Sequence, residues 1–202
     1  MTDFFAEYLT EILIINGIIY ADKRDFYMYG LDLFFIKLSF YVTILVLSII
    51  TNTLPISILY VLLFTMLRKY TGGYHSKTFT LCFLTSILIY LVMILIYRIA
   101  VETVVAPMTI CAVISFIIVI LFAPVESINK PLSVDEQKKY RKISLILVSI
   151  YCLASVITLN LNYYWVSFVL SWSLTADAVL IILGKFMKGE VHNEEGSVKS
   201  NC

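Results

Sequence analysis

Long stretches without a charged residue constrain this chain more than any other feature of its sequence. A run of about 20 apolar residues is enough for a helix to cross the hydrocarbon core of a bilayer. Apolar residues make up 60% of the 202 residues, above the roughly 45–50% of a soluble domain. A soluble fold is therefore disfavoured. The uncharged stretches are Leu38–Leu67, Phe79–Tyr97, Val104–Phe122, Ile143–Leu161 and Tyr163–Leu183, the last interrupted only by Asp177.

The stretch Leu38–Leu67 is too long for one span and short for two. Its 30 residues would form a helix about 45 Å long, against a hydrocarbon core about 30 Å thick. The residues Thr51-Asn52-Thr53-Leu54-Pro55 lie in its middle, and Asn and Pro break or cap helices. We therefore expect two short helices that meet in a hairpin. The resulting fold class is an all-α, polytopic membrane bundle of about six transmembrane helices.

The positions of Lys and Arg predict which span ends face the cytoplasm, because basic residues near span ends accumulate on that side. Six spans with cytoplasmic termini leave only Arg98 of the 15 basic residues outside. Five spans would also move Lys23, Arg24 and Lys37 outside, so six is the better topology. The expected divisions are an N-terminal cytoplasmic segment at 1–35, a membrane domain at 36–183 with spans at about 36–52, 54–67, 79–97, 104–122, 143–161 and 163–183, and a cytoplasmic polar tail at 184–202.

The N-terminal segment predicts an amphipathic helix over residues 3–15. Apolar side chains recur there at helical spacing opposite Asp3, Glu7 and Glu11, and these acidic residues are atypical of a cleaved signal peptide. The helix would lie on the inner leaflet or pack against the bundle, and the sequence leaves both open. The net charge of only +1 gives no indication of a nucleic-acid partner.

Three of the four cysteines have no predicted chemical role. Cys111 and Cys152 fall in the middle of spans, where a thiol is usually a small apolar filler, and Cys202 ends the polar tail. The sequence contains no CxxC pair, so neither a disulfide framework nor a metal site is expected, and no cofactor is predicted. Cys82 differs because of its neighbours.

Cys82 and His75 lie in the segment 68–82, which joins the second and third spans. A cysteine and a histidine at a membrane surface suggest a thiolate nucleophile with an imidazole base. In one continuous helix the two residues would lie about 10.5 Å apart along the axis, beyond the reach of direct proton transfer. Gly72-Gly73 allows a non-helical backbone, so His75 could fold back over the start of the next helix. Cys82 would then lie in the first turns of that helix, where unpaired N–H groups favour a thiolate.

This segment resembles the accessory gene regulator B (AgrB) family of bacterial quorum-sensing membrane peptidases. The resemblance rests on an Arg/Lys-rich start, then Gly-Gly-Tyr-His, then six residues and a Cys at the inner end of a span. Three further stretches also look like family landmarks, namely Tyr29-Gly30-Leu31, Ala123-Pro124-Val125 and Asn129-Lys130-Pro131-Leu132.

The resemblance implies a cysteine endopeptidase in the bacterial cell membrane, with Cys82 as the nucleophile and His75 as the general base. Its substrate would be a short amphipathic propeptide, cut on the cytoplasmic side. Thiolate attack would release the C-terminal tail and leave a thioester, which a thiol or hydroxyl of the propeptide could close into a thiolactone or lactone. A small peptide transporter is the alternative, although a transporter is expected to show internal repeats and we find none.

Several other residues are candidates for the site. Asp177 is the only acidic residue inside a predicted span, which makes it a functional candidate by default. It could orient His75 as the third member of a triad or pair with polar side chains for packing, and both remain open. Basic residues could bind an acidic propeptide tail or simply enforce topology. The substrate-binding candidates are Arg68, Lys69, Gly72, Gly73, Lys130, Lys138 and Lys139, and a homodimer is expected on general grounds only.

Overall fold

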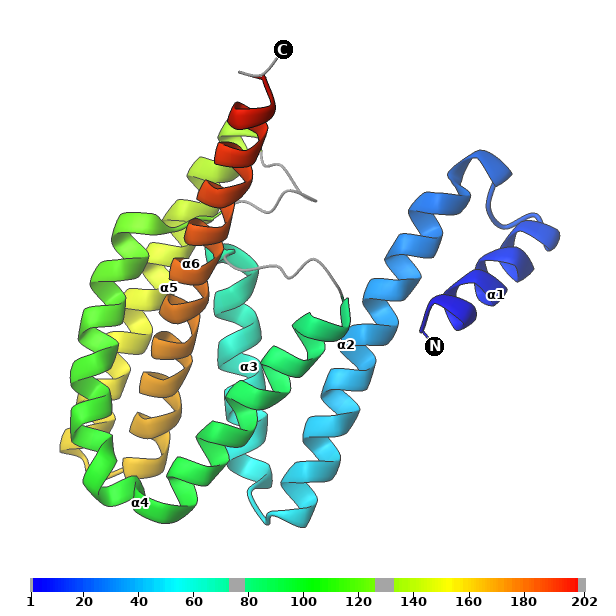
Figure 1. Ribbon diagram of the computed structural model, residues 1–202. Coiled ribbons are helices and arrows are strands. Elements are labelled where there is room, and N and C mark those ends of the chain that lie inside the picture. Colours follow the sequence, from blue (N-terminus) through cyan, green and yellow to red (C-terminus); the bar gives the residue numbers. More distant parts are fainter. Residues whose placement is uncertain (1, 73–78, 126–132, 200–202) are drawn as a thin grey trace.

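The computed structural model describes residues 2–72, 79–125 and 133–199, and every regular element in these ranges is a helix (Figure 1). The expected all-α fold is therefore confirmed. The elements are α1 (Thr2–Ile15), the short 3-10 helix η1 (Ala21–Lys23), α2 (Arg24–Ile50), α3 (Leu54–Thr71), α4 (Phe79–Phe122), α5 (Val134–Asn160) and α6 (Tyr164–Lys199).

Five of the described helices, α2 to α6, are long and apolar enough to cross a membrane. The long helix α4 is not straight, because Ala100 has a non-helical backbone with φ −154° and ψ 30°. Figure 1 shows the chain turning back at this kink, so that the two arms of α4 form a V and both extend from the kink toward the same end of the bundle. One helix therefore supplies the two apolar segments that the sequence predicts at 79–97 and 104–122. The chain is a polytopic helical bundle.

Short turns with an asparagine connect the neighbouring helices. Asn52, between α2 and α3, has φ 49°, and Asn162, between α5 and α6, has φ 62°. Asparagine adopts this left-handed conformation more readily than most residues. The break after Ile50 thus lies where the sequence predicts the hairpin.

At the start of α5, the Ser133 hydroxyl accepts from the Glu136 N–H and the Glu136 carboxylate accepts from the Ser133 N–H, which is a capping box.

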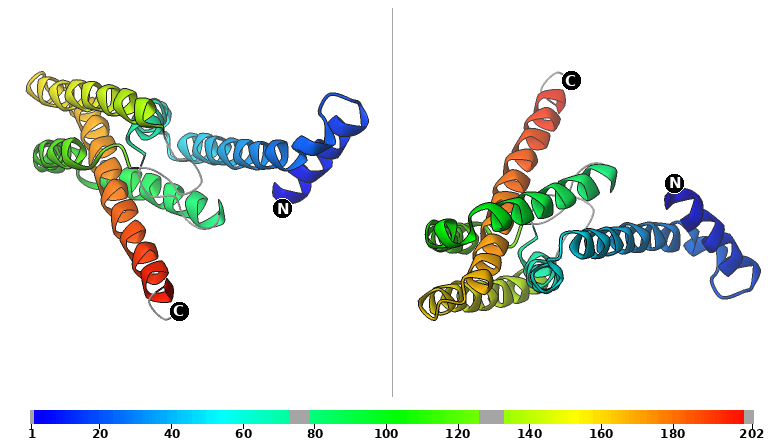
Figure 2. Two further views of the ribbon diagram at one scale, coloured as in Figure 1. Left: turned by 90° about the horizontal axis from the view of Figure 1, so that it is seen from above. Right: turned by 90° about the horizontal axis from the view of Figure 1, so that it is seen from below.

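Helix α6 lies at the centre of the bundle. In its most apolar stretch 61% of the residues are buried, against 12–33% in the other four long helices. It contributes Phe168 and Val169 to a core with α3 and the first arm of α4, and Leu174 and Ile181 to a core with the second arm and α5. Figure 2 shows α2 and α1 extending to one side of this bundle. A residue on α6 can therefore contact either half of the bundle.

Helix α1 packs against α2 by a different face from the apolar stripe of the sequence. Ala6 and Thr10 are fully buried, whereas Tyr8, which belongs to the predicted stripe, is 57% exposed. The Arg24 guanidinium donates to the Glu7 carboxylate at 2.9 Å and so ties the two helices together. Helix α2 begins at Arg24, well ahead of position 36, because a helix can continue beyond the apolar residues that would lie in a membrane. The position of α1 on the inner leaflet stays a prediction.

The two ends of the bundle differ in charge. Figure 1 shows the end of α3, the start of α4 and the start of α5 at one end, and the kink of α4 with the two short turns at the other. The first end carries many basic residues, whereas the second has Arg98 beside Glu102. Basic residues favour the cytoplasmic side. The basic residues of the first end include Arg68, Lys69, Lys138, Lys139, Arg141, Lys142 and Lys185.

This asymmetry predicts that the kink of α4 faces outward. Ile99 is 74% exposed there, and Ile99→Cys in a variant without the native cysteines is expected to react with a membrane-impermeant maleimide on intact cells. The matched control is Lys139→Cys at the basic end, which is expected to react only after the cells are permeabilised. Labelling in the reverse pattern would show that the predicted orientation is wrong.

Candidate active site

The end of α3 has a backbone conformation that requires glycine. Gly72 caps the helix with φ 70° and ψ −137°, a region that residues with a Cβ rarely adopt. A Cβ on Gly72 would lie 2.0 Å from the Val125 carbonyl oxygen. The Val125 N–H in turn donates to the Thr71 carbonyl at 2.9 Å, and Gly72 and Val125 form a backbone bridge. The segment after α4 is therefore fastened to the last residues of α3.

Asp177 joins this end of α3 to the central helix α6. The Thr71 hydroxyl lies 3.0 Å from the Asp177 Oδ1 and donates to it, and Asp177 is fully buried. The Arg68 guanidinium donates to the Gly72 carbonyl oxygen and interacts electrostatically with the Asp177 carboxyl group. The structure thus brings together three predicted candidates, namely Arg68, Gly72 and Asp177.

The second oxygen of Asp177 has no such contact. Oδ2 is buried and accepts no hydrogen bond from any residue that the structure describes. A buried carboxyl oxygen without a donor is costly, so structures usually retain one for a specific reason. The chain directly after Gly72 contains His75, which together with Gly73 lies outside the described residues. The predicted contact between Asp177 and His75 therefore stays a prediction.

Cys82 belongs to the first turn of α4, which begins at Phe79. The first turn of a helix has backbone N–H groups without partners in the helix, and these stabilise a nearby anion. This is the position that the sequence predicts for Cys82. The start of α4 and the anchored end of α3 therefore bound the short segment 73–78.

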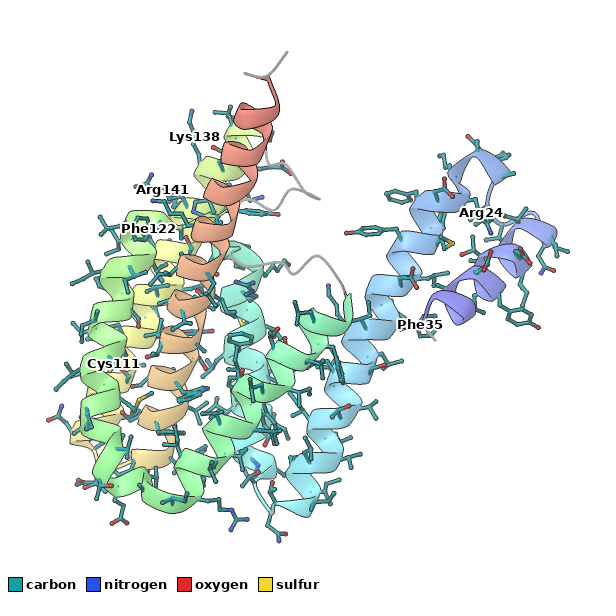
Figure 3. The ribbon with its side chains drawn as sticks, in the orientation of Figure 1. Arg24, Phe35, Cys111, Phe122, Lys138 and Arg141 are labelled. Atoms are coloured by element: carbon teal, nitrogen blue, oxygen red, sulfur yellow. The ribbon has the colours of Figure 1, made fainter. Side chains whose placement is uncertain are left out.

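The basic candidates lie around the same end of the bundle. Lys69 is exposed, and its Nζ is 5.4 Å from the centre of the Tyr70 ring. The Tyr70 ring packs edge-on against the Tyr140 ring of α5, and the two ring centres are 5.7 Å apart. This contact places the second turn of α5 beside the end of α3. Lys138 and Lys139 are exposed in that turn, and Lys130 lies outside the described residues. Figure 3 shows Lys138.

Two residues of this arrangement were not expected from the sequence to belong to the site. Thr71 connects Asp177 to α3, and Val125 pairs with the backbone of Thr71 and Gly72. Thr71 gives no signal of its own, because a threonine near a helix end is common. Val125 belongs to one of the landmark stretches noted above, but the sequence does not indicate that it contacts the glycine segment. In the described parts of the chain, no three His, Cys, Asp or Glu side chains are grouped so as to hold a metal ion.

Comparisons with known proteins show the family of this chain. The family model described as Accessory gene regulator B matches residues 5–183. An AgrB-like protein of Clostridium perfringens strain SM101 is 28% identical over 171 residues, which cover 81% of this chain and 78% of the relative. AgrB-like protein 2 of Clostridium perfringens strain 13 is 27% identical over 169 residues, covering 80% and 77%. No solved structure gives a significant match. The matched residues include the segment 68–82 and Asp177. The chain belongs to the Accessory gene regulator B (AgrB) family, and this membership supports a role in the agr quorum-sensing system.

Proposed function

We propose that this membrane protein is a cysteine endopeptidase that cuts the C-terminal tail from an amphipathic autoinducer propeptide and promotes its cyclisation. The observation that carries the proposal is the position of Cys82, in the first turn of α4 and seven residues after His75. This turn lies at the basic end of the bundle (Figure 1). Family membership over residues 5–183 supports the same reading, because the Gly-Gly-Tyr-His segment and Cys82 lie within the match.

The chemistry begins with the Cys82 thiol. His75 takes the thiol proton, and the thiolate attacks the carbonyl carbon at the cleavage site of the propeptide. The resulting tetrahedral intermediate collapses, His75 returns the proton to the leaving amine, and the C-terminal tail departs. The N-terminal part of the propeptide stays on Cys82 as a thioester.

A second exchange releases the product. A thiol or hydroxyl of the propeptide gives its proton to His75 and attacks the thioester carbonyl, which expels the Cys82 thiolate and closes a thiolactone or lactone ring; the proton on His75 then returns to Cys82. A thiolactone has about the same bond energy as the thioester that it replaces, so the step needs no nucleotide. Water would hydrolyse the thioester instead, and a nucleophile at the start of an apolar helix is partly protected from water.

The basic residues around the site are proposed to bind the propeptide. An acidic tail would be attracted by the exposed cations Lys69, Lys138 and Lys139, and by Lys130, which precedes α5 in the sequence. The Arg68 guanidinium donates to the Gly72 carbonyl oxygen and interacts electrostatically with the Asp177 carboxyl group, which gives Arg68 a structural part in the site as well. Lipid surrounds the apolar helices and delivers an amphipathic substrate to this boundary.

The proposal is tested by co-expressing the chain with a candidate propeptide and analysing both by mass spectrometry. We expect a released C-terminal tail and, on Cys82, an adduct with the mass of the N-terminal fragment. Hydroxylamine cleaves thioesters, so it is expected to remove the adduct. A propeptide that stays at full length and is recovered outside the cells would instead support the peptide transporter.

A further inference from the structure

A buried carboxyl group links the centre of the bundle to the residue that opens the catalytic segment. Asp177 is fully buried on α6, and its Oδ1 accepts from the hydroxyl of Thr71, which lies 106 positions earlier in the chain. Within a membrane protein an ionisable side chain in a span is costly and is retained for a reason. Among the described residues of the membrane-spanning helices, neutral groups also join one helix to another, such as the Ser57 and Tyr90 hydroxyls at 2.7 Å. A carboxyl group is therefore more than packing requires.

Asp177 contacts Thr71 and interacts electrostatically with Arg68, and both of these residues are linked to Gly72. Thr71 is the preceding residue, and its carbonyl accepts from the Val125 N–H at 2.9 Å. Arg68 donates to the Gly72 carbonyl oxygen, so the guanidinium interacts with Gly72 and with the Asp177 carboxyl group at once. A continuous series of contacts thus runs from α6 to the point where the chain leaves α3.

We propose that Asp177 is a positioning residue for the endopeptidase reaction and acts through Thr71 and Arg68 on the conformation of Gly72. The inference rests on the proposed function, since Gly72 opens the segment that leads to His75 and Cys82. Fixing the Thr71 side chain and the Gly72 carbonyl sets the direction in which that segment starts. Such a role affects the turnover of bound propeptide more than its binding, because catalysis is sensitive to small displacements of the reacting groups.

Thr71→Val tests the link with the least change in shape, because it replaces the hydroxyl with a methyl group. We expect kcat for propeptide cleavage by the purified full-length protein in lipid nanodiscs to fall about tenfold, since the buried carboxyl group loses its hydrogen-bond donor. KM is expected to change little. Thr71→Ser restores the hydroxyl and is expected to recover most of the turnover.

The series is completed by Asp177→Ala and by the double variant with Thr71→Val. If both residues act through one contact, the double variant is expected to be no slower than Asp177→Ala alone. The matched control is Ser173→Ala, because Ser173 is equally buried one turn away on α6, but its hydroxyl donates to Val169 of its own helix and to no other described residue. Its kcat is expected to equal that of the unchanged protein.

Three results would overturn the inference. The first is an unchanged kcat in Thr71→Val, and the second is an equal loss of kcat in Thr71→Val and Thr71→Ser. The third is a loss of kcat in the Asp177→Ala, Thr71→Val double variant that equals the two single losses combined. Cys82→Ala is assayed beside them. Continued cleavage by Cys82→Ala would refute the proposed function itself, whereas an inactive Cys82→Ala with a fully active Thr71→Val would refute only the positioning role of Asp177.

Discussion

Replacing Cys82 with alanine is expected to leave the co-expressed propeptide uncut, a loss in cleavage rate of at least about a thousandfold. In the proposed mechanism the Cys82 thiolate forms the acyl intermediate, so its loss stops the reaction at the first step. Cys82→Ser, which changes one atom, is expected to be almost as inactive because a hydroxyl is a far weaker nucleophile than a thiolate at neutral pH. The size of the propeptide by gel electrophoresis or mass spectrometry gives the result.

His75→Ala is expected to cause a similar loss, because the thiol then has no base and the leaving amine has no acid. The best matched control is Cys111→Ala. Cys111 is an exposed free cysteine on the same helix as Cys82 but in the other arm of α4 (Figure 3). The Cys111→Ala variant is expected to cleave the propeptide at the same rate as the unchanged protein. Product formed by Cys82→Ala or His75→Ala at the level of Cys111→Ala would contradict the catalytic assignment.

The helices could largely be predicted because a bilayer imposes a length on every apolar segment. The stretch Leu38–Leu67 exceeded that length and contained Asn52 and Pro55, and the structure has α2 and α3 on either side of Asn52. The limits of the helices were harder to predict. Helix α2 extends back to Arg24, since backbone hydrogen bonding continues a helix wherever the side chains permit it, in lipid or in water.

The face by which α1 packs was also beyond prediction from periodicity. The apolar stripe containing Tyr8 is not the face against α2, where the small residues Ala6 and Thr10 lie. Small side chains allow two helices to approach closely, so size decides the contact more than hydropathy does. A pattern of apolar residues does not separate a face that meets lipid from a face that meets another helix.

The candidate site was predicted in its parts but not in its connections. The Gly-Gly segment and the start of the next helix indicated where Cys82 would lie, and α4 does begin just before it. The cost of a carboxyl group in a span indicated Asp177. Its contact with Thr71 and the bridge between Gly72 and Val125 depend on how α3, α4 and α6 pack, and one sequence contains no record of that packing.

Adding one methyl group at Gly72 is expected to reduce propeptide cleavage roughly a hundredfold. In Gly72→Ala the Cβ would lie 2.0 Å from the Val125 carbonyl oxygen, and that oxygen belongs to the backbone, so it cannot rotate aside. The segment after α4 must therefore separate from α3. The bridge that holds Thr71 and Gly72 breaks, and the chain that leads to Cys82 starts in a changed direction.

Two other glycines separate this clash from the general effects of the substitution. Gly17 also has a positive φ of 69°, but a Cβ there would have no atom within 4 Å, so Gly17→Ala adds backbone strain alone. That strain costs about 1–2 kcal/mol of stability and is expected to leave the cleavage rate unchanged. Gly30→Ala adds neither strain nor a clash, because Gly30 lies in α2 with open space around it.

Cleavage is measured per molecule of enzyme in the membrane, so that differences in expression are removed. If Gly72→Ala cleaves like Gly17→Ala, the contact with Val125 does not position the catalytic segment, and the role that we assign to Asp177 through Thr71 and Arg68 loses its physical basis as well.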